Sequence, residues 1–224
     1  MICALCRTEL FEVDSFLQFF GLVKTEGKEL CYSCQSGFEI IGSDCCPDCG
    51  RQQVNRQKCY DCQRWQYQQK PSLHHRALYK YNDAMRSFMQ QYKFTGDYML
   101  RKIFNRQLIQ LVHNTNMDLV VPIPVSQYTM RTRGFNQVTG MLEGIQLTNA
   151  LQVISVKKRQ QSNLNRNDRM KRKQLFDIQD STLIIGKSIL LVDDVYTTGS
   201  TLHCAAELLI SCGAVSVKSV SLAR

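Results

Sequence analysis

One stretch of sequence decides the fold of this 224-residue chain: Ile189-Leu190-Leu191-Val192-Asp193-Asp194-Val195-Tyr196-Thr197-Thr198-Gly199-Ser200-Thr201. Its four apolar residues predict a buried strand, and the amphipathic residues after Ser200 predict a helix. The turn at residues 197–201 is rich in hydroxyl groups and lies at the helix N-terminus, where unpaired N–H groups and the helix dipole hold phosphates. Gly199 lets the backbone approach such an anion because it has no Cβ. The stretch therefore predicts a strand, a phosphate-binding turn and a helix in succession.

Two adjacent acids, Asp193 and Asp194, stand between this strand and the turn. Buried strands seldom end in paired carboxylates, so an ordinary capped turn does not account for them. Both acids would repel a phosphate in the turn, which means that they should face something neutral and rich in hydroxyl groups. A ribose 5-phosphate meets both conditions, with its phosphate in the turn and its 2′- and 3′-hydroxyls on the acids.

From residue 118 onward, short β-branched apolar runs alternate with amphipathic segments of helix length. The runs predict strands at residues 119–122, 151–156, 188–192 and 216–221. The segments between them predict helices at residues 136–148 and 200–212. Upstream, the pattern indicates a strand at residues 77–81 and helices at residues 84–92 and 97–113. Such alternation is typical of an α/β fold with a doubly wound parallel sheet, whose ligands bind in the loops that follow the strands, here after residues 121, 156 and 192.

The cysteines and the positive charge lie in different parts of the chain. Nine of the 11 cysteines precede residue 63, and residues 1–64 carry seven basic and nine acidic side chains, a net charge of −2. Residues 65–224 carry 21 basic and ten acidic side chains, a net charge of +11. We therefore expect a cysteine-rich domain at residues 1–64, a polar linker at residues 65–76 that contains a proline, and the α/β domain at residues 77–224.

Eight of the early cysteines form four Cys-x-x-Cys pairs, a spacing that brings two sulfurs to one zinc ion. The predicted zinc ligands are Cys3, Cys6, Cys31, Cys34, Cys46, Cys49, Cys59 and Cys62. Nine residues separate the last two pairs and 24 separate the first two, so consecutive pairing would give two structural zinc ribbons. A crossed pairing fits the spacing too. Cys45 is left over, and disulfides would be the alternative for an exported chain.

Apolar runs are too short for a membrane span, which needs roughly 18 such residues. The first residues also lack the basic start and apolar stretch of a signal peptide. These features predict a cytoplasmic protein, where zinc explains many cysteines better than disulfides do.

The densest run of positive charge falls between residues 157 and 173. It contains one acid and eight basic residues, Lys157, Lys158, Arg159, Arg166, Arg169, Lys171, Arg172 and Lys173. One interpretation is a mobile, solvated loop. The other is a surface that contacts the phosphates of a polyanion, with single-stranded DNA as the expected partner.

The strand-turn-helix stretch resembles the fingerprint of the type I phosphoribosyltransferases, in which four apolar residues and two acids precede Thr-Gly-Ser/Thr-Thr. The match, residues 189–201, covers the whole fingerprint. The resemblance implies that this element binds phosphoribosyl pyrophosphate with Mg²⁺. The 5′-phosphate would lie on Thr197, Thr198, Gly199, Ser200 and Thr201, and Asp193 and Asp194 would hold the ribose hydroxyls.

A second motif narrows the resemblance to the ComF family, the late competence proteins of naturally transformable bacteria. Val120-Val121-Pro122-Ile123-Pro124 is followed by Arg131, Arg133 and then Gly134-Phe135-Asn136-Gln137. The family also carries a cysteine-rich ribbon ahead of a transferase-like domain, so the resemblance spans nearly the entire chain. It implies that Arg131 and Arg133 flank the pyrophosphate and that residues 157–173 form a mobile loop over the site.

Two functions remain open at this point. The first is an accessory protein for DNA uptake that binds phosphoribosyl pyrophosphate and single-stranded DNA and docks a helicase-like ATPase through its ribbon, a role implied by the ComF resemblance. The second is a working phosphoribosyltransferase, in which Mg²⁺ and the arginines would stabilise the leaving pyrophosphate. No segment is assigned as a nucleobase pocket, which favours binding over transfer.

Overall fold

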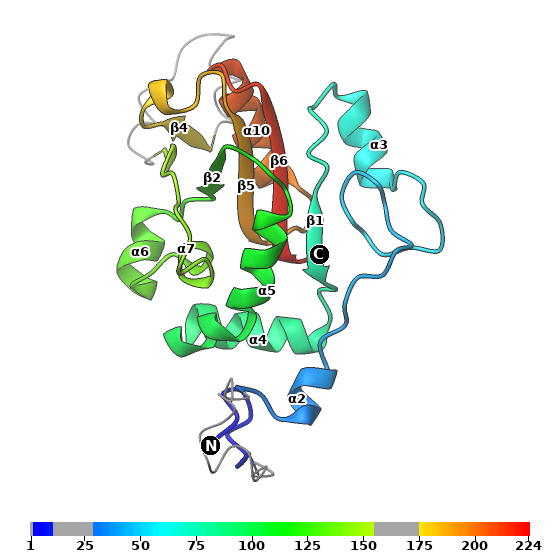
Figure 1. The fold of residues 1–224 in the computed structure, drawn as a ribbon, viewed down its shortest axis with the longest axis vertical. Coiled ribbons are helices and arrows are strands. Elements are labelled where there is room, and N and C mark those ends of the chain that lie inside the picture. The colour runs from blue at the N-terminus through cyan, green and yellow to red at the C-terminus, as the bar shows by residue number, and fades with distance from the viewer. Residues whose placement is uncertain (1, 11–28, 155–174) are drawn as a thin grey trace, which may run out of the picture.

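The computed structural model describes residues 2–10, 29–154 and 175–224 (Figure 1). Its main sheet has four strands in the order β1-β6-β5-β2, and each neighbouring pair is parallel. The strands are β1 (Arg76–Tyr79), β2 (Leu119–Pro122), β5 (Ser188–Val195) and β6 (Ser216–Ala223). This arrangement confirms the predicted α/β fold with a parallel sheet.

Helices cover both faces of the sheet, with α5 on one face and α10 on the other (Figure 1). The helices are α2 (Tyr32–Ser36), α3 (Tyr60–Tyr67), α4 (Asp83–Phe94), α5 (Lys102–His113), α6 (Gln127–Arg133), α7 (Gln137–Met141) and α10 (Ser200–Ser211). Two 3-10 turns, η1 (Tyr98–Arg101) and η2 (Ser181–Leu183), precede α5 and β5. Within the described ranges, none of these helices has the length and apolarity that crossing a membrane requires.

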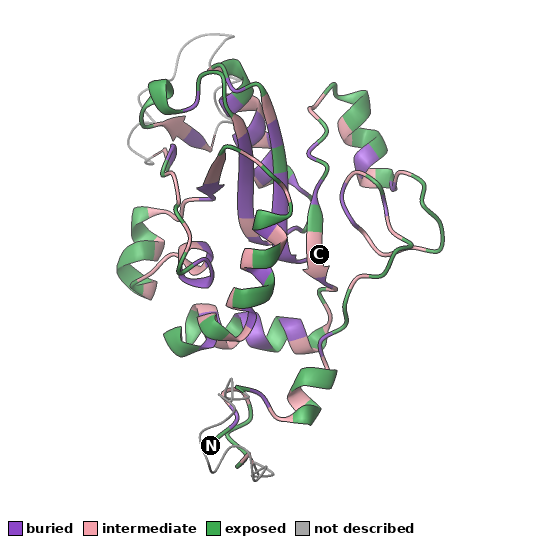
Figure 2. Ribbon diagram, in the orientation of Figure 1, coloured by how far each residue is buried: buried purple, intermediate pink, exposed green. Residues whose placement is uncertain are grey.

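Strand β5 divides the interior into two cores because successive side chains of a strand point to opposite faces. Leu190 and Val192 pack into the core beneath α4 and α5. Ile189 and Leu191 pack into the core beneath α10. All four side chains are fully buried, and the centre of the sheet is correspondingly purple in Figure 2.

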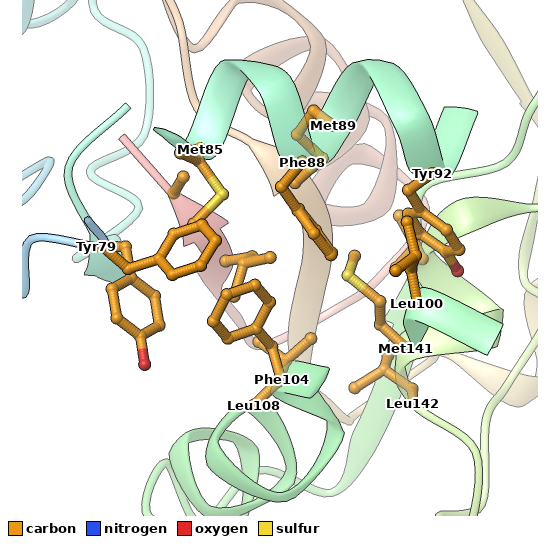
Figure 3. Packing of buried hydrophobic residues seen from close by; sticks show 14 of the residues in the cluster. Tyr79, Met85, Phe88, Met89, Tyr92, Leu100, Phe104, Leu108, Met141 and Leu142 are labelled. Atoms are coloured by element: carbon orange, nitrogen blue, oxygen red, sulfur yellow. The ribbon is translucent and has the colours of Figure 1, made fainter. Parts of the chain in front are cut away.

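The first core is built on one face of α4 (Figure 3). Its buried residues, Met85, Phe88, Met89 and Tyr92, follow the spacing of a single helix face. Phe88 meets Phe104 of α5 edge to face, with ring centroids 4.9 Å apart. This packing fixes the C-terminal end of α4, and with it Lys93, next to the end of β5.

One predicted strand pairs differently from expectation. Residues 151–156 were expected in the parallel sheet, but β3 (Leu151–Val153) pairs antiparallel with β4 (Phe176–Ile178) in a separate two-stranded sheet. An apolar run of this length predicts a strand without identifying its partner. The strand that precedes the expected ligand loop therefore does not belong to the main sheet.

The helix expected at residues 136–148 is much shorter, because α7 ends at Met141. Gly144 has φ +103°, a conformation that an α-helix cannot continue through. Helix α6 was not predicted, although the residues that cap its two ends are typical of helix termini. Ser126 caps its first turn by accepting a hydrogen bond from Thr129 N, and Gly134 ends it at φ +84°.

The segment expected as a linker, residues 65–76, lies against the sheet. Helix α3 extends into it as far as Tyr67, and the Leu73 and His75 side chains are buried. The two ring nitrogens of His75 lie 2.9 Å and 3.0 Å from the hydroxyl oxygens of Ser219 and Ser221 on β6. Their hydrogen bonds hold this segment on the strand.

Candidate functional site

The predicted phosphate-binding turn connects the end of β5 to the N-terminus of α10. Gly199 is the N-cap of α10 and has φ +80°. A Cβ at this position would collide with the hydroxyl and ring of Tyr196, so only glycine lets the turn lie on that ring. The first intrahelical hydrogen bond runs from His203 N to Gly199 O (2.9 Å). The preceding N–H groups of the 12-residue helix therefore have no partner within it.

The turn offers hydroxyl groups as well as N–H groups. Thr197, Thr198 and Ser200 are exposed, and the hydroxyl oxygens of Thr198 and Ser200 lie 2.9 Å apart. Thr201 is partly buried in the first turn of α10. Donors of this kind at a helix N-terminus bind a phosphate dianion well. We refer to residues 196–201 as the phosphate loop.

The two acids lie near the end of β5 and point in different directions. Strand β5 continues to Val195, so alternation places Asp194 on the face with α4 and Asp193 on the face with α10. Asp194 is 5% exposed and forms an ion pair with Lys93 in the last turn of α4. Asp193 is partly buried, and burial, followed by the charge of Asp194, raises the pKa of its carboxyl group. Of the two acids, Asp194 alone forms an ion pair with another described residue of the chain.

The loop after β2 leaves the sheet beside these acids. Pro122 pairs with Val192, and Ile123 N donates to Val192 O (2.9 Å). The Asn136 side chain donates to Ile123 O (3.0 Å) and thereby holds the loop in place. Two of the three predicted ligand loops, those after residues 121 and 192, thus start at the same edge of the sheet, as expected from parallel strands.

The two predicted pyrophosphate arginines lie in the last turn of α6. Arg133 contacts the Gln137 side chain, and its guanidinium carbon lies 5.7 Å from the centroid of the Phe94 ring. Arg131 is exposed. Phe94 follows Lys93 in α4, so Arg133 lies beside the C-terminal end of that helix. The structure thus brings Lys93 to the acid pair and Arg133 to the same end of α4, and it shows no contact of either arginine with the acids among the described residues.

The first cysteine tetrad contains Cys3, Cys6, Cys31 and Cys34, whose sulfurs lie within 4.8 Å of one another. Cys6 and Cys31 sulfurs are 3.6 Å apart, close to the edge of about 3.8 Å in a zinc–thiolate tetrahedron with 2.3 Å bonds. Backbone N–H groups of Cys31 and Cys34 donate to the sulfurs of Cys3 (3.3 Å) and Cys31 (3.4 Å). The donor set fits a structural zinc ion.

The second tetrad contains Cys46, Cys49, Cys59 and Cys62, and all four residues are buried. The Cys49 and Cys59 sulfurs are 3.5 Å apart, and Cys59 N donates to the Cys46 sulfur (3.3 Å). A hydrogen bond from Cys62 and the charge of Arg224 lower the pKa of the Cys49 thiol to about 4, which favours the thiolate that zinc binds. Both tetrads therefore follow the consecutive pairing, and Cys45 belongs to neither.

The two tetrads fit structural rather than catalytic zinc. Four cysteines satisfy the four positions of a tetrahedral ion, whereas a catalytic zinc keeps one position for water or substrate. Zinc would act here by folding the short segments around each tetrad.

The eight basic residues of the 157–173 run lie outside the described residues. Their predicted contact with a polyanion consequently stays a prediction.

Sequence reasoning missed three residues that complete the site. Lys93 forms an ion pair with Asp194. Trp65 donates from Nε1 to the Thr198 carbonyl oxygen (2.9 Å), and Arg224 donates to the carbonyl oxygens of Tyr196 and Thr197. Trp65 is the single tryptophan of the chain and lies three residues after Cys62. Its position beside a predicted zinc ligand is the one feature of the sequence that could have indicated a role.

Comparison with known proteins agrees with this geometry. Residues 101–224 match the family described as Phosphoribosyl transferase domain. Over its full length the chain is 38% identical to Competence protein ComFC of Streptococcus pneumoniae, also over that protein's full length. It is 34% identical to Competence protein ComFC of Bacillus subtilis, covering 100% of this chain and 95% of that protein. Competence protein F of Haemophilus influenzae is 25% identical over 87% of this chain and 90% of its own length. The chain therefore belongs to the ComF family and contains a phosphoribosyltransferase domain.

Proposed function

We propose that this protein serves DNA uptake in natural transformation and binds phosphoribosyl pyrophosphate with Mg²⁺ at the phosphate loop. The observation that carries the proposal is the position of this loop, a glycine-dependent turn at a helix N-terminus that directly follows two acids. A phosphate and a neutral polyol are the groups that such an arrangement accommodates side by side. The competence role follows from the full-length similarity to the two ComFC proteins.

Each part of the site has a share in binding this ligand. The N–H and hydroxyl groups of the phosphate loop hold the 5′-phosphate, and Asp193 accepts hydrogen bonds from the ribose. Arg131 and Arg133 of α6 flank the pyrophosphate in this proposal, and Lys93 adds positive charge beside Asp194. Mg²⁺, when bound, neutralises charge on the pyrophosphate oxygens.

Calorimetric titration with phosphoribosyl pyrophosphate and Mg²⁺ tests the proposal directly. Binding is expected for the wild-type protein and at least tenfold weaker binding for Asp193→Asn. Asp83→Asn is the matched control, because the Asp83 side chain is 93% exposed on α4. Equal affinity of Asp193→Asn and the wild type would remove the acid from the site, and absence of heat with the wild type would refute ligand binding.

Single-stranded DNA is the proposed macromolecular partner. The net charge of +11 in residues 65–224 supports it, because basic side chains bind the DNA backbone without reading sequence. A helicase-like ATPase that docks on the net acidic residues 1–64 would be the protein partner. Pull-down of that ATPase by the wild-type protein, compared with a protein whose tetrads have been emptied by a chelator, tests the docking.

Transfer of the phosphoribosyl group is the second candidate function, and the two acids favour it. Asp193 and Asp194 could stabilise the positive charge that develops on the ribose as pyrophosphate leaves. Release of pyrophosphate in the presence of candidate acceptors, abolished by Asp193→Asn, would establish transfer.

A further inference from the structure

Arg224, the residue after β6, joins the second tetrad to the phosphate loop. Its Nε and Nη2 donate to the Cys49 sulfur at 3.3 Å and 3.1 Å. Its Nη1 donates to the carbonyl oxygens of Tyr196 (3.2 Å) and Thr197 (2.7 Å). One guanidinium group therefore bonds to a tetrad sulfur and to two consecutive peptide units of the loop.

Helix α3 supplies a second connection. It begins directly after Cys59 and includes Cys62, so the tetrad fixes its first turn. One turn further along, Trp65 donates from Nε1 to the Thr198 carbonyl oxygen (2.9 Å). The Trp65 ring also packs on His203 in the first turn of α10, with centroids 4.5 Å apart.

Three consecutive carbonyl oxygens of the loop, those of residues 196, 197 and 198, thus accept hydrogen bonds from side chains held at the second tetrad. The C=O and N–H groups of a planar trans peptide point in opposite directions. Holding these carbonyls toward the tetrad turns the N–H groups of Thr197, Thr198 and Gly199 away from it. Those N–H groups are the donors that an anion in the loop requires.

The ring under the loop is held by the same arginine. The Arg224 guanidinium carbon lies 4.4 Å from the centroid of the Tyr196 ring, and the ring of buried His75 lies 4.3 Å from it, centroid to centroid. Tyr196 is only 3% exposed. Because the Tyr196 ring leaves room for nothing larger than glycine at position 199, its placement also sets the path of the loop.

We propose that Arg224 is a positioning residue through which the second tetrad, loaded with zinc, sets the conformation of the phosphate loop. Metal binding at the tetrad and phosphoribosyl pyrophosphate binding at the loop then strengthen each other, since coupling between two sites is reciprocal. The inference rests on the proposed function and adds a regulation to the same site.

The first tetrad provides an internal comparison. Cys3 packs into the core beneath α4 and α5, together with Leu30 and Phe38. The second tetrad packs into the core beneath α10, where Tyr196 also lies. Coupling to the loop is therefore expected for the second zinc ion and not for the first.

Two measurements on the full chain test the inference. The first is hydrogen exchange of the phosphate-loop amides without ligand, which should be at least fivefold faster in Arg224→Gln than in the wild type. The second is the rate at which pyridylazoresorcinol removes zinc. In the wild type, phosphoribosyl pyrophosphate with Mg²⁺ should slow the removal of one of the two zinc ions at least fivefold, the size of an ordinary coupling between two sites. In Arg224→Gln the ligand should leave the rate of zinc removal unchanged.

Arg76→Gln is the matched control, because Arg76 also lies beside the second tetrad and donates to the Pro47 and His75 carbonyl oxygens, but it has no hydrogen bond to a tetrad sulfur or to the phosphate loop among the described residues. It should behave like the wild type in both measurements. Arg224→Lys should show the same faster loop exchange and the same loss of zinc protection as Arg224→Gln, since an ammonium group lacks the planar fork that reaches sulfur and carbonyls together. Unchanged exchange and unchanged zinc protection in Arg224→Gln would overturn the inference while leaving the proposed function intact. Failure of the wild type to bind the ligand would instead refute the proposed function. The positioning role would then be judged from hydrogen exchange alone, and it would be rejected if Arg224→Gln left the exchange of the loop amides unchanged.

Discussion

Lys93, at the end of α4, forms an ion pair with Asp194, at the end of β5, and both side chains are largely buried. The pair joins the first core to the candidate ligand site, because α4 is anchored by Phe88 and Tyr92 and Asp194 belongs to the acid pair. A buried carboxylate without a partner is costly, so this pairing matters to the fold as well as to the site.

Replacing Lys93 by Met should lower the free energy of unfolding by about 3 kcal/mol, because it leaves Asp194 buried and uncompensated. Adding Asp194→Asn to that variant should recover more than 1 kcal/mol of the loss, which a double-mutant cycle from urea denaturation measures. Arg86→Met is the control, since its pair with Asp83 on the same helix is exposed and should contribute at most about 0.5 kcal/mol. Additive effects of the two buried substitutions would contradict the pairing.

Gly199→Ala should weaken the binding of phosphoribosyl pyrophosphate at least tenfold, because the new methyl group collides with Tyr196 and displaces the loop. Gly186→Ala is a close control: Gly186 has φ +72°, yet a Cβ there would meet nothing within 4 Å. Both variants carry the cost of about 1 kcal/mol for a left-handed alanine. Calorimetry should show normal affinity for Gly186→Ala only, and equal affinities would mean that the loop tolerates the collision.

Much of this site could be predicted from sequence because its determinants are local. The strand, the acids, Gly199 and the four Cys-x-x-Cys pairs each depend on neighbouring residues and were recognised without a structure. The pairing of β3 with β4 and the contacts of Lys93, Trp65 and Arg224 depend on residues brought together by folding. Arg224 is 175 residues from Cys49, and no pattern around either residue indicates that they meet.

Replacing Cys46 and Cys49 together by Ser should reduce the zinc content from two ions to one per chain, because the second tetrad loses half of its ligands. Zinc is measured by mass spectrometry of metals after gel filtration. Cys45→Ser should retain both ions, since Cys45 lies outside the tetrads although it adjoins Cys46. A double variant that keeps two zinc ions would refute the ligand assignment.

Stability should fall between neutral and mildly acidic pH, in part because of His203. Burial lowers the pKa of His203 from 6.5 to about 4, so below pH 6.5 the unfolded chain takes up a proton that the native protein refuses. Between pH 7.5 and pH 5 this difference removes about 2 kcal/mol of stability. His203→Phe keeps the packing against Trp65 and should show a fall smaller by that amount in urea denaturation. Zinc release is expected in both proteins, so an identical fall in the two proteins would exclude His203 as a cause.

The basic run is expected to bind single-stranded DNA through its phosphates. Neutralising Lys171, Arg172 and Lys173 by Gln should weaken binding to oligonucleotides of any sequence and reduce the slope of log affinity against log salt by about 0.7 per lost contact. Fluorescence anisotropy at several salt concentrations measures both quantities. Lys187→Gln with Lys218→Gln changes the charge elsewhere and serves as the comparison, with the slope expected to stay near the wild-type value. A slope that is unchanged in the triple variant would mean that DNA does not contact these three side chains, and the positive charge of the domain would then act at another surface.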